Sequence, residues 1–397
     1  MTQYKFPLGQ NVHDADDILK MVETLLTGKF TMGEQVEKFE KMFAEYIGVK
    51  YAVMVNSGSS ANLLALAAIT NYQCSNKLLP GDEVLVPVVC WSTSVFPIIQ
   101  NGLIPIFVDV DPTTLNVDLK DLEKKITPKT KAMVLVHVLG NCANMNQLME
   151  IVNQHKLILI EDTCESLGSS YNQQYLGTFG DIGTYSFYYS HHITTAEGGC
   201  VVTNNDEYYE LIKSLRAHGW SRSLKNKEEI QQKHPDLDAR FTFVNLGYNL
   251  RPMEIQATMG ISQLQKLQTK NNNRKINYHK IKEKIQSDSR GKFLSFPVQT
   301  ELADAVWFGI ILFLQEGLDL SNYLEYLSKQ GVENRPIVTG NMIRQPVIKD
   351  LYPQLKPEDF PGAEECHFRG LFIGLSCNLM SDESIEELVN IILGYQP

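Results

Sequence analysis

The chain of 397 residues carries 36 Lys and Arg against 46 Asp and Glu, and a net charge of -10 argues against a surface that binds nucleic acid. Its length suits two domains, since single domains hold roughly 100 to 250 residues. The N-terminal segment MTQYKFPLGQNVHD lacks the basic start and apolar run of a secretory signal. No apolar run approaches the ~20 residues that span a bilayer. We therefore expect a folded cytoplasmic protein.

The seven cysteines are scattered, odd in number and include no C-x-x-C or C-x-C pair. This pattern predicts reduced, mostly buried thiols, and we expect no metal site.

From about residue 50 to 205, short β-branched runs alternate with helical stretches. Such alternation predicts a mostly parallel sheet that is covered by helices on both faces, and therefore an α/β fold. Ligands of these sheets bind beyond the carboxyl ends of the strands, so the residues that follow each run are candidates for a site. The expected strands are 51–55, 82–87, 105–110, 132–138 and 157–162, and the clearest helices are 59–69 and 144–155.

The segment from RPMEIQATMG to about Ser287 predicts one long helix, with Pro252 in its first turn. Beyond it, a strand is expected at 307–314, and helices at 320–330 and 383–393, which suits a smaller α+β domain. We expect a large domain over residues 1–260 with an N-terminal arm. Residues 261–397 would form the connecting helix and the small C-terminal domain.

The stretch VNSGSSANLLAL is a candidate phosphate-binding turn. Gly58 permits a tight turn after a strand, and Ser59 and Ser60 open a helix whose free N–H groups and hydroxyls would hold a phosphate. The plainer alternative is that Ser59 only caps the helix.

Two further stretches carry candidate side chains. LILIEDTCES delivers Asp162 to the carboxyl end of an apolar strand, where a carboxylate can pair with a protonated ring nitrogen; the alternative role is a helix cap. SFYYSHHITTAEGG offers the hydroxyl of Ser186 for a phosphate, and His191 follows five residues later. A single histidine on a loop is usually structural, so this stretch decides little alone.

Taken together and in this order, the three stretches resemble the fold type I pyridoxal-phosphate enzymes, and most closely the DegT group of sugar-nucleotide aminotransferases. The resemblance runs from FTMGEQVEKFEKMFAEYIGVKYAVMVNSGSSAN through GTFGDIGTYSF, RAHGW and GYNLRPMEIQA to RPIVTGN. It implies a mostly parallel central sheet in a large cofactor-binding domain and a smaller α+β C-terminal domain. These aminotransferases carry S-F-x-x-T-K-N-x-x-T-x-E-G-G, and their lysine forms a Schiff base with the cofactor. Here His191 stands at the position of the lysine.

The exchange of lysine for His191 changes the chemistry that the resemblance implies. Imidazole has no primary amine and cannot form the Schiff base, and no lysine lies between Lys156 and Lys213. A histidine, with an ordinary pKa near ~6.5, suits general acid–base work. The same departure occurs in a subset of the family, the sugar 3-dehydratases. One branch of these holds an iron–sulfur cluster, whose C-x-C pattern is absent here; the other, in the colitose pathway, needs no cluster and is the more similar.

The resemblance to that second branch implies a reaction and its partners. The substrate would be GDP-4-keto-6-deoxymannose, with another nucleotide or a related heptose left open. The cofactor would alternate between pyridoxal and pyridoxamine phosphate, L-glutamate would supply the amino group, and 2-oxoglutarate and ammonia would be released. His191 would be the acid–base catalyst that removes the 3-hydroxyl. Two rival hypotheses are an ordinary sugar aminotransferase and an inactive relative that only binds a nucleotide sugar.

Further roles follow from the resemblance, residue by residue. His192 would orient the loop, and Trp91 would stack on the cofactor ring or, alternatively, fill the core. Asn249 would reach the phosphate from the other subunit of a homodimer with shared active sites. The expected site is Gly58, Ser59, Ser186 and Asn249 for the phosphate, Asp162 for the pyridine nitrogen, Trp91 and Glu165 elsewhere on the cofactor, and His218 and Arg335 for glutamate or sugar, with structural ion pairing as the alternative for Arg335.

Overall fold

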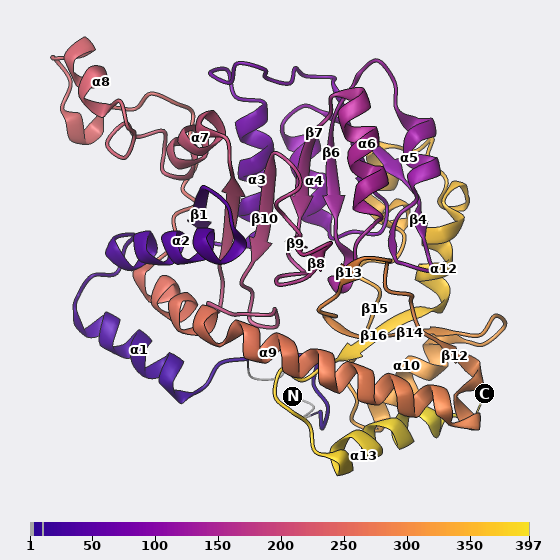
Figure 1. Cartoon of the computed structure of the whole chain (residues 1–397). Helices are drawn as coiled ribbons and strands as arrows, with labels where there is room; N and C mark the ends of the chain where they lie inside the picture. Colours follow the sequence, from indigo (N-terminus) through magenta and orange to yellow (C-terminus); the bar gives the residue numbers. More distant parts are fainter. Residues whose placement is uncertain (1–3, 10–11, 397) are drawn as a thin grey trace.

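The computed structural model describes residues 4–9 and 12–396. Its centre is a seven-stranded sheet in the order β1-β11-β10-β7-β6-β2-β3 (Figure 1). Only β11 runs antiparallel to its neighbours in this sheet, and the remaining pairs are parallel. The α/β fold expected from the sequence is thereby confirmed. The strands are β1 (Tyr51–Val55), β2 (Glu83–Pro87), β3 (Ile104–Val108), β6 (Thr130–Val136), β7 (Ile158–Asp162), β10 (Ile182–Ser186) and β11 (Gly199–Thr203).

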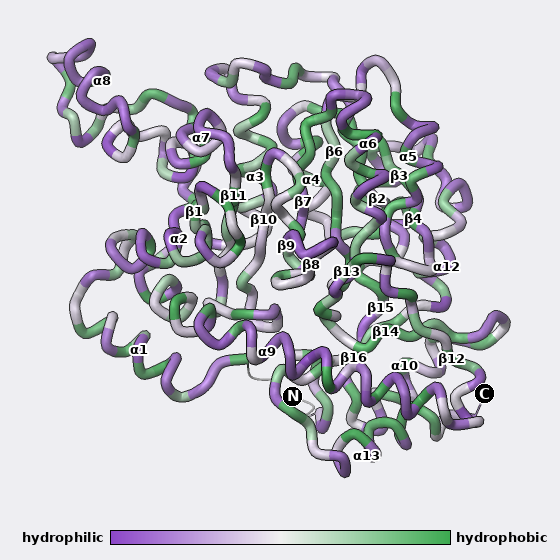
Figure 2. Tube along the Cα trace, viewed as in Figure 1, coloured by the Kyte–Doolittle hydropathy of each residue, from purple (hydrophilic) through white to green (hydrophobic). Residues whose placement is uncertain are grey.

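Both faces of this sheet are buried. Successive side chains of a strand point to opposite faces, and each set packs into a different cluster of the core. In β6, Val134 packs into the cluster that includes α3, α4 and α7, whereas Met133 and Leu135 pack with α5 and α6. In Figure 2 the strands β2, β3 and β6 carry mostly the green of hydrophobic residues. The covering helices are α2 (Glu34–Ile47), α3 (Gly58–Ile69), α4 (Ser92–Gln100), α5 (Leu119–Lys125), α6 (Met145–His155) and α7 (Asp206–Arg216).

A second, antiparallel sheet has the order β12-β14-β16-β15 and belongs to the C-terminal part of the chain. Helix α9 (Glu254–Ser287) runs from the large sheet to this smaller one (Figure 1). The smaller part comprises β12 (Leu294–Ser295), β14 (Gly309–Leu314), β15 (Asn334–Pro336), β16 (Gly370–Gly374), α10 (Leu320–Lys329), α11 (Pro346–Leu351), α12 (Pro361–Arg369) and α13 (Asp382–Leu393).

The expectation that Pro252 lies in the first turn of α9 was wrong. Pro252 lies before the helix, whose N-cap is Met253 with φ -104° and ψ 155°. Met253 is held extended because it forms an antiparallel bridge with Thr31.

The other elements are short or peripheral. No helix in the described ranges is both long and apolar enough to cross a membrane. All seven cysteines are free, and all but Cys164 are buried. The peripheral elements are α1 (Ala15–Leu26), α8 (Lys227–Lys233), β4 (Val110–Asp111), β5 (Asn116–Val117), β8 (Ser170–Tyr171), β9 (Gln174–Tyr175), β13 (Ala303–Asp304) and five 3-10 turns at Val138–Gly140, Ala239–Phe241, Ser289–Phe293, Met342–Arg344 and Pro357–Asp359.

Candidate active site

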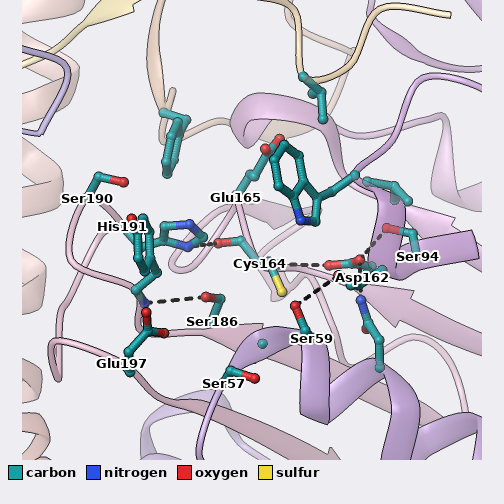
Figure 3. A pocket seen from close by; sticks show the side chains of 18 residues that line it. Ser57, Ser59, Ser94, Asp162, Cys164, Glu165, Ser186, Ser190, His191 and Glu197 are labelled. Carbon is teal, nitrogen blue, oxygen red and sulfur yellow. Dashed lines mark hydrogen bonds between the residues drawn. The ribbon is translucent and has the colours of Figure 1, made fainter. Parts of the chain in front are cut away.

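A cavity of about 390 Å³ opens where the carboxyl ends of β1, β2, β7 and β10 meet. This is the edge at which open α/β sheets bind ligands. Most of its lining comes from the segments that follow these strands, and the smaller part of the chain adds two residues (Figure 3). The lining consists of Ser57, Gly58, Ser59, Asn62, Trp91, Thr93, Ser94, Val136, Asp162, Cys164, Glu165, Ser186, Tyr188, Ser190, His191, Glu197, Phe308 and Val338.

The N-terminus of α3 forms an anion cradle in one wall of the cavity. Ser57 is the N-cap, and its side chain accepts a hydrogen bond from the N–H of Ser60 at 3.1 Å. The N–H groups of Gly58 and Ser59 precede the first intrahelical hydrogen bond, which Ala61 donates to the Ser57 carbonyl. Such free N–H groups at the positive end of a helix attract anions. Ser59 is therefore not the cap, and its hydroxyl lies 3.1 Å from that of Thr93.

Glycine at position 58 allows Ser186 to approach this cradle. A Cβ at Gly58 would lie 2.5 Å from the Cβ of Ser186 and 2.9 Å from its Oγ. The missing side chain lets the end of β10 touch the turn after β1. The Ser186 hydroxyl thus lies beside the helix N-terminus.

Asp162 ends β7 as a buried carboxylate on the far side of the cavity. Its Oδ2 accepts hydrogen bonds from Asn62 Nδ2 and Ser94 Oγ, both at 2.7 Å, and its Oδ1 accepts one from the N–H of Cys164 at 3.2 Å. These three donors fix the position of the carboxyl group. No helix begins at Asp162, so it is not a helix cap. The neighbouring Glu161 points to the opposite face, where three backbone N–H groups bind it.

Sequence reasoning missed Asn62, Ser94 and Thr93. Asn62 follows Gly58 by four residues on α3 and therefore shares its face of the helix. Ser94 and Thr93 lie in the first turn of α4, directly after Trp91. Polar side chains in the first turn after a parallel strand are the signal that could have identified them.

Glu165 lines the cavity, and the pKa of its carboxyl group is raised. Its Oε2 accepts a hydrogen bond from the N–H of Leu139 at 3.0 Å. Burial, and to a smaller extent the charge of Asp162, raises the pKa of Glu165 to about 7. Near neutral pH this carboxyl group can therefore either donate or accept a hydrogen bond.

His191 faces the same cavity from the turn that follows β10. Its Nδ1 lies 2.8 Å from the carbonyl oxygen of Cys164. A carbonyl can only accept, so Nδ1 carries the hydrogen, and Nε2 carries the lone pair when the ring is neutral. Burial lowers the pKa of His191 to about 4, so the ring is neutral at pH 7. Figure 3 shows His191 and Asp162 on opposite sides of the cavity.

His192 turns away from the cavity into the core. Its side chain is fully buried, and its Nε2 donates a hydrogen bond to the carbonyl oxygen of Val306 at 3.1 Å. Burial lowers the pKa of His192 well below its ordinary range. The two adjacent histidines thus have different surroundings, and only His191 lines the cavity.

Trp91 lies at the mouth of the cavity rather than in the core. It is the N-cap of α4 and is 58% exposed. The alternative that Trp91 fills the core is therefore wrong.

The other expected residues lie outside the cavity of this chain. Asn249 is exposed and accepts a hydrogen bond from Arg251 Nε at 2.9 Å. His218 packs its ring against Trp220, with the ring centroids 4.7 Å apart. Arg335 on β15 forms an exposed ion pair with Glu333 at 2.9 Å, which was the alternative considered for it.

The cavity lining is unevenly charged. It includes the carboxyl groups of Asp162, Glu165 and Glu197, and among the described residues it includes neither lysine nor arginine. An anionic ligand would find N–H groups and hydroxyls here, but its positive counter-charge would have to come from beyond this lining.

Comparisons with known proteins agree with this geometry. The family model described as the DegT/DnrJ/EryC1/StrS aminotransferase family matches residues 12–393. A GDP-4-keto-6-deoxy-D-mannose 3-dehydratase of Escherichia coli O55:H7 is 39% identical over 377 residues, which are 93% of this chain and 95% of the relative.

Two solved structures of GDP-4-keto-6-deoxymannose-3-dehydratase are also similar. A histidine-to-asparagine variant with bound GDP-perosamine has a TM-score of 0.90 and 37% identity, and the match covers 98% of this chain and 100% of the other. A structure with a trapped PLP-glutamate geminal diamine has a TM-score of 0.88 and the same identity and coverage. From the family match over nearly the whole chain, we conclude that this protein belongs to the DegT/DnrJ/EryC1/StrS aminotransferase family.

Proposed function

We propose that this protein is a pyridoxal-phosphate-dependent 3-dehydratase that converts GDP-4-keto-6-deoxy-D-mannose to GDP-4-keto-3,6-dideoxymannose. L-Glutamate supplies the amino group, and 2-oxoglutarate and ammonia are released. One observation carries the proposal. In the turn after β10, His191 occupies the position of the Schiff-base lysine, and no lysine is among the described residues that line the cavity. The names of the similar dehydratases support the substrate, and the PLP–glutamate adduct in one of them supports the amino donor.

The residues present fit pyridoxal phosphate. An anion cradle at one end of the cavity lies opposite the buried, hydrogen-bonded carboxyl group of Asp162 at the other, which matches a phosphate and a protonated pyridine nitrogen. Bound there, the cofactor would supply an amino-group carrier and an electron sink. Gly58, Ser59 and Ser186 would hold the phosphate, Asp162 the ring nitrogen, and Trp91 the ring face.

His191 moves the protons in this proposal. Above a pH of about 4 its Nε2 is neutral and can remove a proton, and the protonated ring can then deliver one to the departing 3-hydroxyl. Asp162 would pair with the protonated ring nitrogen of the bound cofactor, and its three hydrogen-bond donors hold the carboxyl group in place. Since no lysine is among the described residues that line the cavity, none of their amines would recapture the cofactor, and we expect the nitrogen to leave as ammonia.

We further propose a homodimer in the cytoplasm, with active sites shared between subunits. Among the described residues, the lining of the cavity includes neither Asn249 nor a positive side chain, and we expect the partner to supply Asn249 and its neighbours. Asn249 is exposed, and it forms a bridge with Ala217 that ties the stretch around His218 to the same surface. The stretch of chain around Asn249 also exposes apolar side chains, which are common at interfaces. Between residues 237 and 253 these are Leu237, Phe241, Phe243, Leu246, Tyr248 and Met253.

The test is a product assay. The protein is incubated with pyridoxal phosphate, glutamate and GDP-4-keto-6-deoxymannose, and the sugar nucleotide is analysed by mass spectrometry. We expect a product that is one oxygen atom lighter than the substrate, together with 2-oxoglutarate. Parallel reactions with other 4-keto-6-deoxy sugar nucleotides test the choice of substrate. An amino sugar, or a borohydride-stable link between cofactor and protein, would instead identify an aminotransferase.

A further inference from the structure

The imidazole of His191 is held on two sides. Its Nδ1 donates to the Cys164 carbonyl at 2.8 Å. The ring of Phe308 meets it nearly perpendicularly, with the centroids 5.2 Å apart and an interplanar angle of 81°. Phe308 lies just before β14, so this contact comes from the smaller part of the chain. The hydrogen bond fixes one edge of the imidazole, and the aromatic contact restricts rotation about that bond.

His192 holds the segment that carries Phe308. Its Nε2 donates to the Val306 carbonyl at 3.1 Å, and its ring lies 5.7 Å from that of Phe308. The Val306 oxygen is tightly enclosed, since a Cβ at Gly140 would lie only 2.2 Å from it. A buried carbonyl that loses its donor costs about 1–3 kcal/mol, so this position favours a side chain with an N–H.

The backbone of Phe308 is fixed at both ends. Its N–H donates to the carbonyl of Leu139 at 3.0 Å, and its carbonyl accepts from Nη1 of the buried Arg274 at 3.3 Å. Arg274 also donates to the carbonyl of Leu375 at 3.0 Å. The segment around Phe308 is therefore anchored on α9, on the turn after β6 and on His192. The ring of Phe308 lines the cavity.

We propose that His192 is a positioning residue, which holds Phe308 against His191 and so keeps Nε2 of His191 directed at the reacting atoms. This role deepens the proposed dehydratase function and rests on it. It also explains why two histidines are adjacent, since one moves protons and the other fixes its ring. The charged and titratable groups around His191 are Asp162, Cys164, Glu165, Tyr188, Glu197, His192 and Arg274.

The first measurement is the titration of His191 in protein without cofactor, with ¹³C-labelled histidine and assignment by His191→Asn. In the wild type we expect a pKa of about 4. In His192→Leu the ring loses its support and becomes hydrated, so its pKa should rise by about one unit or more toward the ordinary ~6.5. His192→Gln, whose amide N–H can still reach the Val306 carbonyl, should restore the wild-type titration. Phe308→Leu should behave like His192→Leu.

The second measurement is dehydration kinetics of the same variants. We expect a loss in kcat of about tenfold or more for His192→Leu and Phe308→Leu, with KM for the sugar nucleotide within about twofold. Phe360→Leu removes another buried aromatic ring next to α12, and should lower the melting temperature without moving the His191 titration. If His192→Leu does not fold, Phe308→Leu carries the test.

The outcomes separate this inference from the proposed function. An unchanged His191 titration in folded His192→Leu overturns the positioning role, whatever the enzyme catalyses, and an unchanged titration in Phe308→Leu overturns it as well. If both variants shift the His191 titration but the wild-type protein makes only amino sugars, the positioning role of His192 stands. The dehydratase function is then overturned instead.

Discussion

Replacing Asp162 with Asn tests the assignment of the cofactor ring. The substitution keeps the size of the side chain and removes its charge. Asp162 accepts from Asn62, Ser94 and Cys164 N–H, so an amide at position 162 must turn its NH₂ group toward at least one donor. The buried mismatch should lower the free energy of unfolding by about 1–3 kcal/mol.

The larger effect falls on cofactor binding. A carboxylate that accepts a hydrogen bond from a charged ring nitrogen contributes about 1.5–3 kcal/mol. Loss of that interaction corresponds to roughly 10- to 150-fold weaker binding, since about 1.4 kcal/mol is tenfold in an equilibrium constant. Asp162 is only 4% exposed, so water cannot take over its role.

The assay is a titration of cofactor-free protein with pyridoxal phosphate, followed by absorbance. Ser94→Ala is the matched control, because it removes one of the three donors and keeps the carboxylate; its affinity should fall less than about tenfold. Asp162→Asn that binds pyridoxal phosphate as tightly as Ser94→Ala would refute the assignment of Asp162 to the ring nitrogen.

Three further changes test the site. His191→Asn should abolish dehydration and leave the affinity for pyridoxal phosphate within a few-fold, as checked by kinetics and titration; retained dehydration would place the base elsewhere. Gly58→Ala should lower the free energy of unfolding by about 1–3 kcal/mol in urea, because the new Cβ would lie 2.5 Å from the Cβ of Ser186. Glu165→Gln tests the pKa of about 7, against an ordinary 4.5. A raised pKa stabilises the wild type below pH 4.5, and this stabilisation is lost as the pH rises to about 7. The melting temperature of the variant relative to the wild type should therefore increase over that range in cofactor-free protein, and a constant difference would contradict the raised pKa.

Much of the large sheet could be predicted because its strands are continuous apolar runs. Residues 51–55 match β1, and 157–162 overlap β7, since strands buried on both faces need apolar side chains throughout. The strand order could not be read in the same way. The insertion of the antiparallel β11 between β1 and β10 depends on tertiary pairing, and no local pattern encodes it.

The candidate site divides along similar lines. Several candidate residues lie at the end of a strand or just after it, on one edge of the sheet, so their meeting in one cavity was expected. These are Gly58, Asp162, Ser186 and His191. Phe308 was not expected in the cavity. It lies more than 100 residues beyond His191 in the sequence and reaches the cavity only because the smaller part of the chain packs there.

The expected contacts of Asn249, His218 and Arg335 are not made within one chain. Asn249 and His218 lie next to an exposed apolar segment, where a second copy could bring them to a cavity. Arg335 is already paired with Glu333. A motif match identifies such residues, but their geometry depends on neighbours that a single sequence does not reveal.

The fate of the glutamate nitrogen distinguishes dehydration from amino transfer. The protein would be incubated with ¹⁵N-labelled glutamate, pyridoxal phosphate and GDP-4-keto-6-deoxymannose, and the label followed by NMR and mass spectrometry. A dehydratase with His191 in place of lysine should release all of the label as ammonium and leave none on the sugar. Label that remains on carbon 4 of the sugar nucleotide would contradict the account.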